Sequence, residues 1–196
     1  MWPLFACSII ALAVIIERLF TLRRGQIIPK KLLEEVEQLI LMGRLGDIEQ
    51  LLEKSPSPMC PIIMTAVKNA GLKREVIKEY MEEAGAAQGY SMERYIDILG
   101  IISAIAPLLG FLGTIAGMLI SFKNAGTFGE QQGQLLASGI SEALITTVIG
   151  LTIAIPVYIF YRLLIARSDY LLMEMETASA RILECLKGET HEVQTE

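Results

Sequence analysis

The sequence predicts an all-α integral membrane protein with three transmembrane helices, two of which extend into a cytoplasmic helical bundle. The distribution of charge carries this prediction, because residues 98–122 form an apolar run of 25 residues without one charged side chain in a chain that is 53% hydrophobic. As a helix this run is about 37 Å long, which exceeds the roughly 30 Å of a bilayer's hydrocarbon core. No segment shows the strict polar–apolar alternation of a strand.

Two further apolar stretches complete the set of three spans. Residues 135–161 contain a single charged side chain, Glu142, and residues 1–16 contain none. A cleavable signal peptide has basic residues before its apolar core and small residues after it. Here charged residues follow the stretch instead, at Glu17, Arg18, Arg23 and Arg24. We therefore expect residues 1–17 to be a retained first span.

The basic residues predict how the spans are oriented. The segment between the first and second spans holds 12 of the 17 Lys and Arg residues, whereas the connection between the second and third spans holds only Lys123. Four more follow the third span. Basic residues near the ends of spans concentrate on the cytoplasmic side. The N-terminus is therefore expected outside and the C-terminus inside.

This orientation divides the chain into seven predicted segments. They are a first transmembrane helix at 1–17, a cytoplasmic helical region at 18–97, a second transmembrane helix at 98–122, an outer loop at 123–134, a third transmembrane helix at 135–161, a cytoplasmic helix at 162–187 and a disordered tail at 188–196.

The cytoplasmic region is predicted to be helical rather than a linker, since its apolar residues repeat at helical spacing. Proline, glycine and aspartate mark the expected starts and breaks. The first predicted helix has Pro29 in its first position and ends at a break at Gly43 and Gly46, and a second helix is capped by Asp47. After a turn at 55–58, a third helix runs from Pro61 to Gly71. The last helix runs from Leu72 into the second span, with a soft spot at 85–89.

One face of the second span carries only small, hydroxyl-bearing or helix-perturbing residues. They are spaced by three or four positions, which places them on one side of a helix: Ser103, Pro107, Gly110, Thr114, Gly117 and Ser121. Close helix packing is one interpretation, because small residues let helices approach in a membrane. A polar face that lines a pore is the other.

The third span presents a similar arc that includes a carboxylate. Its members are Ser138, Gly139, Glu142, Thr146 and Gly150, with Thr147 at the edge. A charged group at the centre of a membrane helix costs about 2.5–3.5 kcal/mol, so Glu142 is expected to face protein or water. Two structural alternatives are a protonated Glu142 that forms an interhelical hydrogen bond and a Glu142 that lies at the outer membrane boundary.

Taken together, the two faces predict a pathway built from several copies. Two polar helices in one chain cannot enclose a pathway, but a ring of chains can do so, with the first span outside against lipid. The hydroxyls and the carboxylate would then relay protons or bind a small cation.

Other classes of function find little support in the composition. The three cysteines are far apart and match no metal or redox spacing, and the one histidine, His191, lies in the polar tail. We therefore expect no metal site, no cofactor and no enzyme activity. The net charge of −5, without a basic aromatic patch, argues against nucleic-acid binding.

With these residues in view, the chain resembles the MotA/TolQ/ExbB proton channel family, and is most similar to its three-span ExbB/TolQ branch. The two principal signatures are Ala-Pro-Leu-Leu-Gly-Phe-Leu-Gly-Thr-Ile-Ala-Gly-Met at 106–118 and Gly-Ile-Ser-Glu-Ala-Leu-Ile-Thr-Thr-Val-Ile-Gly-Leu at 139–151. Ala-Ile-Pro at 154–156, Trp2-Pro3-Leu4 and Glu17-Arg18 also match. The chain departs from the family at its start, where relatives usually carry a short amphipathic stretch before the first span.

The resemblance implies a multi-pass protein of the bacterial inner membrane with its N-terminus in the periplasm. It implies a pentamer around a single-span partner of the ExbD or TolR kind, whose movement, driven by protons, acts on a TonB-like or TolA-like protein. The polar residues of this pathway would be Thr114, Glu142 and Thr147. Helical geometry favours Thr146 over Thr147, so both stay candidates.

Several alternatives stay open at this point. Na⁺ would suit the same hydroxyls and carboxylate as H⁺, and the sequence does not choose between the ExbB and TolQ branches or identify the driven machine. A flagellar stator of the MotA kind has four spans and a larger cytoplasmic domain. A secondary transporter usually has internal repeats and more spans. A membrane scaffold that conducts nothing is the third alternative.

Overall fold

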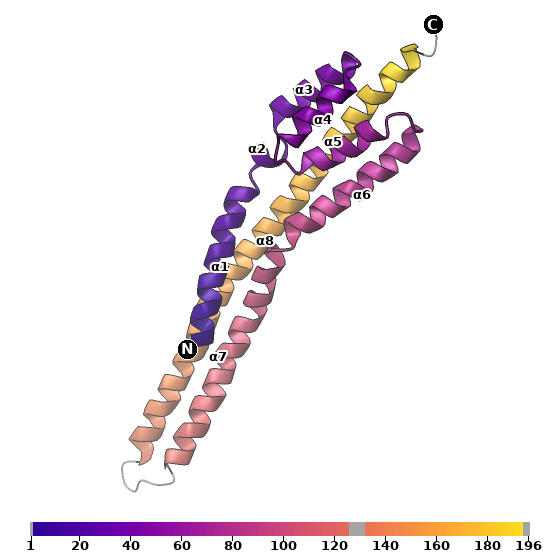
Figure 1. Ribbon diagram of the computed structural model, residues 1–196. Helices are drawn as coiled ribbons and strands as arrows, with labels where there is room; N and C mark the ends of the chain where they lie inside the picture. The colour runs from indigo at the N-terminus through magenta and orange to yellow at the C-terminus, as the bar shows by residue number, and fades with distance from the viewer. Residues whose placement is uncertain (1, 126–131, 194–196) are drawn as a thin grey trace. The chain divides into compact units, whose positions relative to one another are not determined.

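The computed structural model describes residues 2–125 and 132–193, and the side chains of 2–123 and 137–188. These residues form helices and connecting turns and contain no strand, which confirms the predicted all-α class (Figure 1). Three helical stretches are long and apolar enough to cross a membrane: Trp2–Thr21, Arg74–Lys123 and Ala137–Gly188. Two compact units are present, and each is described by itself.

The first unit is built from three long helices and comprises residues 2–18 and Tyr95–Leu164. It contains most of α1 (Trp2–Thr21), all of α7 (Ile96–Ala125) and the first half of α8 (Gln132–Val193). Its small apolar core joins Leu4, Ala106 and Ala154, one from each helix. In this unit α7 and α8 lie side by side along their length, as the pink and orange ribbons show (Figure 1).

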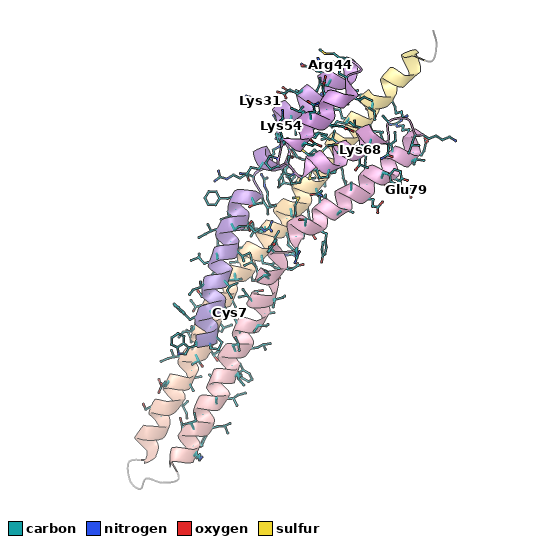
Figure 2. The ribbon with its side chains drawn as sticks, in the orientation of Figure 1. Cys7, Lys31, Arg44, Lys54, Lys68 and Glu79 are labelled. Carbon is teal, nitrogen blue, oxygen red and sulfur yellow. The ribbon has the colours of Figure 1, made fainter. Side chains whose placement is uncertain are left out.

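The second unit is a helical bundle made of Leu19–Arg94 and the chain from Ile165 onward. It contains α2 (Arg24–Ile27), α3 (Lys30–Leu41), α4 (Leu45–Glu53), α5 (Met59–Lys68), α6 (Arg74–Glu93) and the second half of α8. Fully buried apolar side chains from all six helices form its core, including Ile40, Ile48, Ile63, Ile77 and Met175. Its surface is charged, as the exposed cations Lys31, Arg44, Lys54 and Lys68 illustrate (Figure 2).

The predicted starts of the short helices are displaced by one to three residues. Pro29 is the N-cap of α3 rather than its first residue. Gly43, at a φ of 66°, turns the chain after α3 as expected. Asp47 is not a cap but lies in the first turn of α4, where it pairs with Arg44 at 2.5 Å.

The start of α5 has a clear physical cause. This helix begins at Met59, two residues before the predicted Pro61. The Ser57 hydroxyl accepts a hydrogen bond from the Met59 amide at 3.1 Å and donates one to the Ile27 carbonyl at 2.6 Å. Ser57 thereby satisfies an amide that a helix N-terminus leaves free, and it joins the end of α2 to the start of α5.

The expected soft spot at 85–89 is wrong, because α6 runs unbroken through both glycines to Glu93. A Cβ on Gly89 would lie 3.2 Å from Cδ2 of Leu172, so this glycine serves close packing against α8. The chain breaks instead at Arg94 and Tyr95. There the guanidinium of the buried Arg18 stacks over the Tyr95 ring at 4.7 Å.

The prediction that the third span continues as one long helix is confirmed, because α8 is continuous from Gln132 to Val193. It passes through Pro156 and enters the stretch that was predicted to be a disordered tail. Residues 194–196 of that tail, and residues 126–131 of the predicted outer loop, lie outside the described residues.

Candidate functional site

Parts of the predicted polar faces of the second and third spans lie in the contact between α7 and α8 in the first unit. We call this contact the α7–α8 seam. It is lined by small residues of both helices: Ala106, Gly110, Gly113, Gly117 and Ser121 of α7, and Gly139, Ala143, Thr146 and Gly150 of α8.

The glycines of the seam leave no room for a side chain. A Cβ on Gly150 would lie 2.7 Å from the Ala106 carbonyl oxygen, and one on Gly117 would lie 2.7 Å from Cβ of Ala143. A Cβ on Gly110 would lie 3.0 Å from the Thr146 carbonyl oxygen and from Cα of Thr147. The two backbones are therefore as close as small residues permit, and packing accounts for a large part of the predicted stripe.

The adjacent residues Thr146 and Thr147 behave differently. Oγ1 of Thr146 lies 2.7 Å from the carbonyl oxygen of Ala143 in its own helix and 3.2 Å from that of Gly110 in α7. Oγ1 of Thr147 is buried and has no hydrogen-bond partner among the described residues. Both side chains are half-buried.

The hydroxyls of α7 are satisfied within their own helix. Ser103 donates to the Gly100 carbonyl, Ser121 to the Gly117 carbonyl, and Thr114 to the Phe111 carbonyl at 2.6 Å. Thr114 is buried, with 5% of its surface exposed. The hydroxyl oxygens of all three keep lone pairs that can accept a further hydrogen bond.

Glu142 lies beside the seam and not in it. Its side chain and that of Ser138 are exposed in the isolated chain, while the neighbouring Ala143 is buried against α7. Glu142 has no ion-pair or hydrogen-bond partner among the described residues. A carboxylate on the surface of a spanning helix carries the insertion cost noted above unless protein or water covers it. Glu142 is therefore still expected to face water or protein from outside this chain.

The predicted arc on the third span is thus divided. Gly139, Thr146 and Gly150 contact α7, whereas Ser138 and Glu142 point away from the contact. The stripe on α7 is divided in the same way, because Gly110, Gly117 and Ser121 touch α8 while Ser103 and Pro107 lie half-buried beside them. Whether these residues face an ion pathway stays a prediction.

Sequence reasoning missed three members of the seam. Gly113, Ala106 and Ala143 all lie in the contact, and a Cβ on Gly113 would lie 2.6 Å from Oγ1 of Thr146. The signal was present for Gly113, which stands three residues after Gly110 and four before Gly117. That spacing places all three on one helical face.

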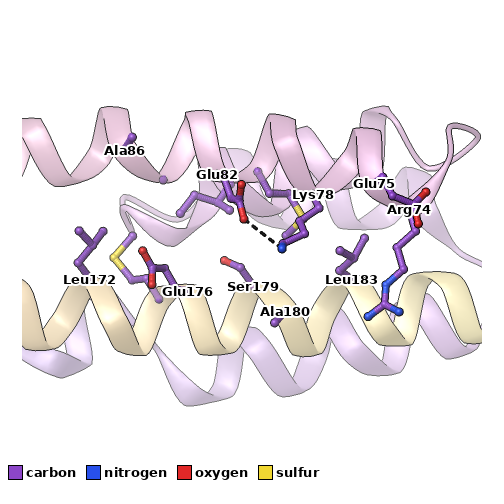
Figure 3. Close-up of a pocket in the computed structure, with 14 residues that line it drawn as sticks. Arg74, Glu75, Lys78, Glu82, Ala86, Leu172, Glu176, Ser179, Ala180 and Leu183 are labelled. Carbon is purple, nitrogen blue, oxygen red and sulfur yellow. Dashed lines mark ion pairs between the residues drawn. The ribbon is translucent and has the colours of Figure 1, made fainter.

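The second unit contains a cavity of about 830 Å³ between α6 and α8. Its floor is apolar, with Met81, Leu172 and Leu183 among its lining residues, and its rim is charged. Figure 3 shows Lys78 and Glu82 at the rim, where their charged groups are 3.4 Å apart. None of the predicted pathway residues lines this cavity.

Comparison with known proteins agrees with the motifs. The profile described as the MotA/TolQ/ExbB proton channel family matches residues 54–177. A putative biopolymer transport protein ExbB-like 3 of Synechocystis is 32% identical over 86% of this chain and 80% of its own length. The biopolymer transport protein exbB1 of Vibrio cholerae is 29% identical over 89% of the chain and 78% of its own length. The Tol-Pal system protein TolQ of Pseudomonas aeruginosa is 31% identical over 60% of the chain and 51% of its own length.

Proposed function

The chain belongs to the MotA/TolQ/ExbB proton channel family, and from this premise we propose that it is the ring-forming subunit of an ion-driven motor. It is a membrane protein of a channel family with relatives in biopolymer transport. In the proposal, protons flow along a pathway beside Thr114 and Glu142, and the chain itself catalyses no reaction.

The exposed carboxylate of Glu142 carries this proposal. Its position on a spanning helix, without a partner among the described residues, is costly against lipid. In a ring of copies the same group faces neighbouring chains, a partner helix or water, and the cost falls. A purely structural role in the α7–α8 seam would not need a carboxylate outside that seam.

The ring is proposed to be a pentamer around a single-span partner similar to ExbD or TolR. The partner would carry the ionisable group that takes up and releases protons, while Glu142 and the hydroxyls adjust the electrostatics and hydrogen bonding along the pathway. The membrane potential supplies about 2.3 kcal/mol per charge per 100 mV to such a device. This work would be delivered to a TonB-like or Tol-like envelope system, with the chain in the bacterial inner membrane and its N-terminus in the periplasm.

Replacement of the two pathway residues tests the proposal in cells. The chromosomal gene is changed to carry Glu142→Gln or Thr114→Val, and cells are assayed for uptake of iron complexes and for resistance to detergent. Both variants are expected to lose whichever of these functions the native chain supports. Native gel electrophoresis should show the oligomer at its normal size, because neither change adds volume to the α7–α8 seam.

Leu144→Ala is the matched control, since Leu144 is an exposed apolar residue of the same helix. It should keep the cellular function. If Glu142→Gln and Thr114→Val also support normal growth in both assays, the chain is a scaffold and the proposed ion pathway is wrong.

A further inference from the structure

Two adjacent threonines of α8 have opposite hydrogen-bonding states, and they share one possible acceptor, the Ala143 carbonyl. The Thr146 hydroxyl reaches two carbonyl oxygens, whereas the buried Thr147 hydroxyl reaches none among the described residues. Both residues lie at the contact with α7, next to Gly110.

A threonine inside a helix ordinarily donates its hydroxyl proton to the carbonyl three or four residues before it. Thr152, for example, donates to the Val148 carbonyl at 2.8 Å. For Thr147 the two such acceptors are the Leu144 and Ala143 carbonyls, and its hydroxyl reaches neither. The Ala143 carbonyl is already occupied. This oxygen also accepts the Thr147 backbone amide in the regular helix, and it lies 2.7 Å from the Thr146 hydroxyl. A carbonyl oxygen has two lone pairs, so both are in use.

The seam holds the Thr146 side chain in this position. Gly113 lies directly against it, so closely that a Cβ there would lie 2.6 Å from Oγ1 and 3.0 Å from Cβ of Thr146. The Gly110 carbonyl, 3.2 Å from the same hydroxyl, offers a second acceptor on α7. The hydroxyl therefore has one proton and two acceptors, one on each helix.

We propose that Thr146 is a positioning residue for Thr147. By occupying the Ala143 carbonyl, Thr146 takes one of the two backbone acceptors of the Thr147 hydroxyl. That hydroxyl, which bonds neither carbonyl, is then available to the ion pathway. This inference rests on the proposed function. It assigns the two candidate threonines different roles. The Thr146 hydroxyl bonds carbonyl oxygens at the α7–α8 seam, whereas the Thr147 hydroxyl interacts with the transported ion.

A pair of substitutions at position 146 separates this role from simple packing. Thr146→Val keeps the branched shape but lacks the hydroxyl, so the Ala143 carbonyl becomes free for Thr147. Thr146→Ser keeps the hydroxyl and removes one methyl group. The protein is purified with its native membrane partner and reconstituted in liposomes that contain a pH-sensitive dye, and proton flux is driven by a K⁺ diffusion potential.

Flux per assembled ring should fall about fivefold in Thr146→Val, the factor that corresponds to one hydrogen bond worth about 1 kcal/mol. It should stay within about twofold of native in Thr146→Ser, since that hydroxyl still occupies the carbonyl. If Val conducts like the native protein, or if Ser loses as much flux as Val, the role of Thr146 is wrong while the proposed function stands. A native complex that conducts nothing would instead overturn the proposed function and this inference together.

Discussion

At the scale of single residues, the α7–α8 seam depends on positions where the neighbour is backbone and cannot move aside. Gly150 faces the Ala106 carbonyl oxygen and Cα of Gly110, whereas Gly113 and Gly139 face the ends of Thr146 and Ser121 side chains. An added methyl group at Gly150 must therefore push the two helices apart. At Gly113 or Gly139 a side-chain rotation can absorb part of the strain.

Gly150→Ala is accordingly expected to destabilise the protein by about 1–3 kcal/mol, the usual cost of overpacking a close contact. Thermal unfolding of the detergent-solubilised chain, followed by circular dichroism, measures the change. Gly46→Ala is the control, because nothing lies within 4 Å of a Cβ at Gly46 in α4. Equal melting temperatures for Gly150→Ala and the native chain would contradict the described closeness of the seam.

At the scale of elements, one buried serine organises the second unit. The Ser57 hydroxyl joins the end of α2 to the start of α5 through two hydrogen bonds, and 5% of the residue's surface is exposed. A second contact of α2 is an ion pair in which Nε of Arg24 lies 2.8 Å from a Glu174 carboxylate oxygen of α8. Of the two, the hydrogen-bonded serine is shielded from solvent, whereas Arg24 is about half exposed and its pair is screened.

Ser57→Ala should therefore lower the free energy of unfolding by about 1–3 kcal/mol, because it leaves a buried amide and a buried carbonyl unpaired. Chemical denaturation in detergent measures this loss. The comparison is Thr65→Ala, whose hydroxyl bonds the Pro61 carbonyl within α5 at an exposed position. A loss at Thr65 as large as that at Ser57 would show that the link between α2 and α5 is not what stabilises the unit.

At the scale of the whole molecule, the features best predicted from the sequence are those that one strong physical effect determines. The absence of charge from 98–122 and the single charge in 135–161 were sufficient to predict the spans, because burying an unpaired charge in lipid is so costly. The helix boundaries were predicted less well. Pro61 marked a helix that in fact begins at Met59, since the capping hydroxyl of Ser57 decides its start.

The candidate site was predicted in composition but not in arrangement. Spacing placed Glu142 and Thr146 on one arc, but it could not show that Thr146 would face α7 while Glu142 stayed exposed beside it. That division depends on which part of the arc packs against α7. It is set by the close packing of Ala143 against Gly117, and the spacing of residues along one helix does not predict such a contact between two helices.

The central claim is that the assembled chains and their partner conduct protons beside Glu142. Its most direct test is proton flux into liposomes that hold the purified complex, driven by a K⁺ diffusion potential and compared between the native chain and Glu142→Gln. The native complex should acidify the lumen when the potential is negative inside, and Glu142→Gln should reduce that flux well below the native level. Equal flux from native and Glu142→Gln complexes would contradict the account.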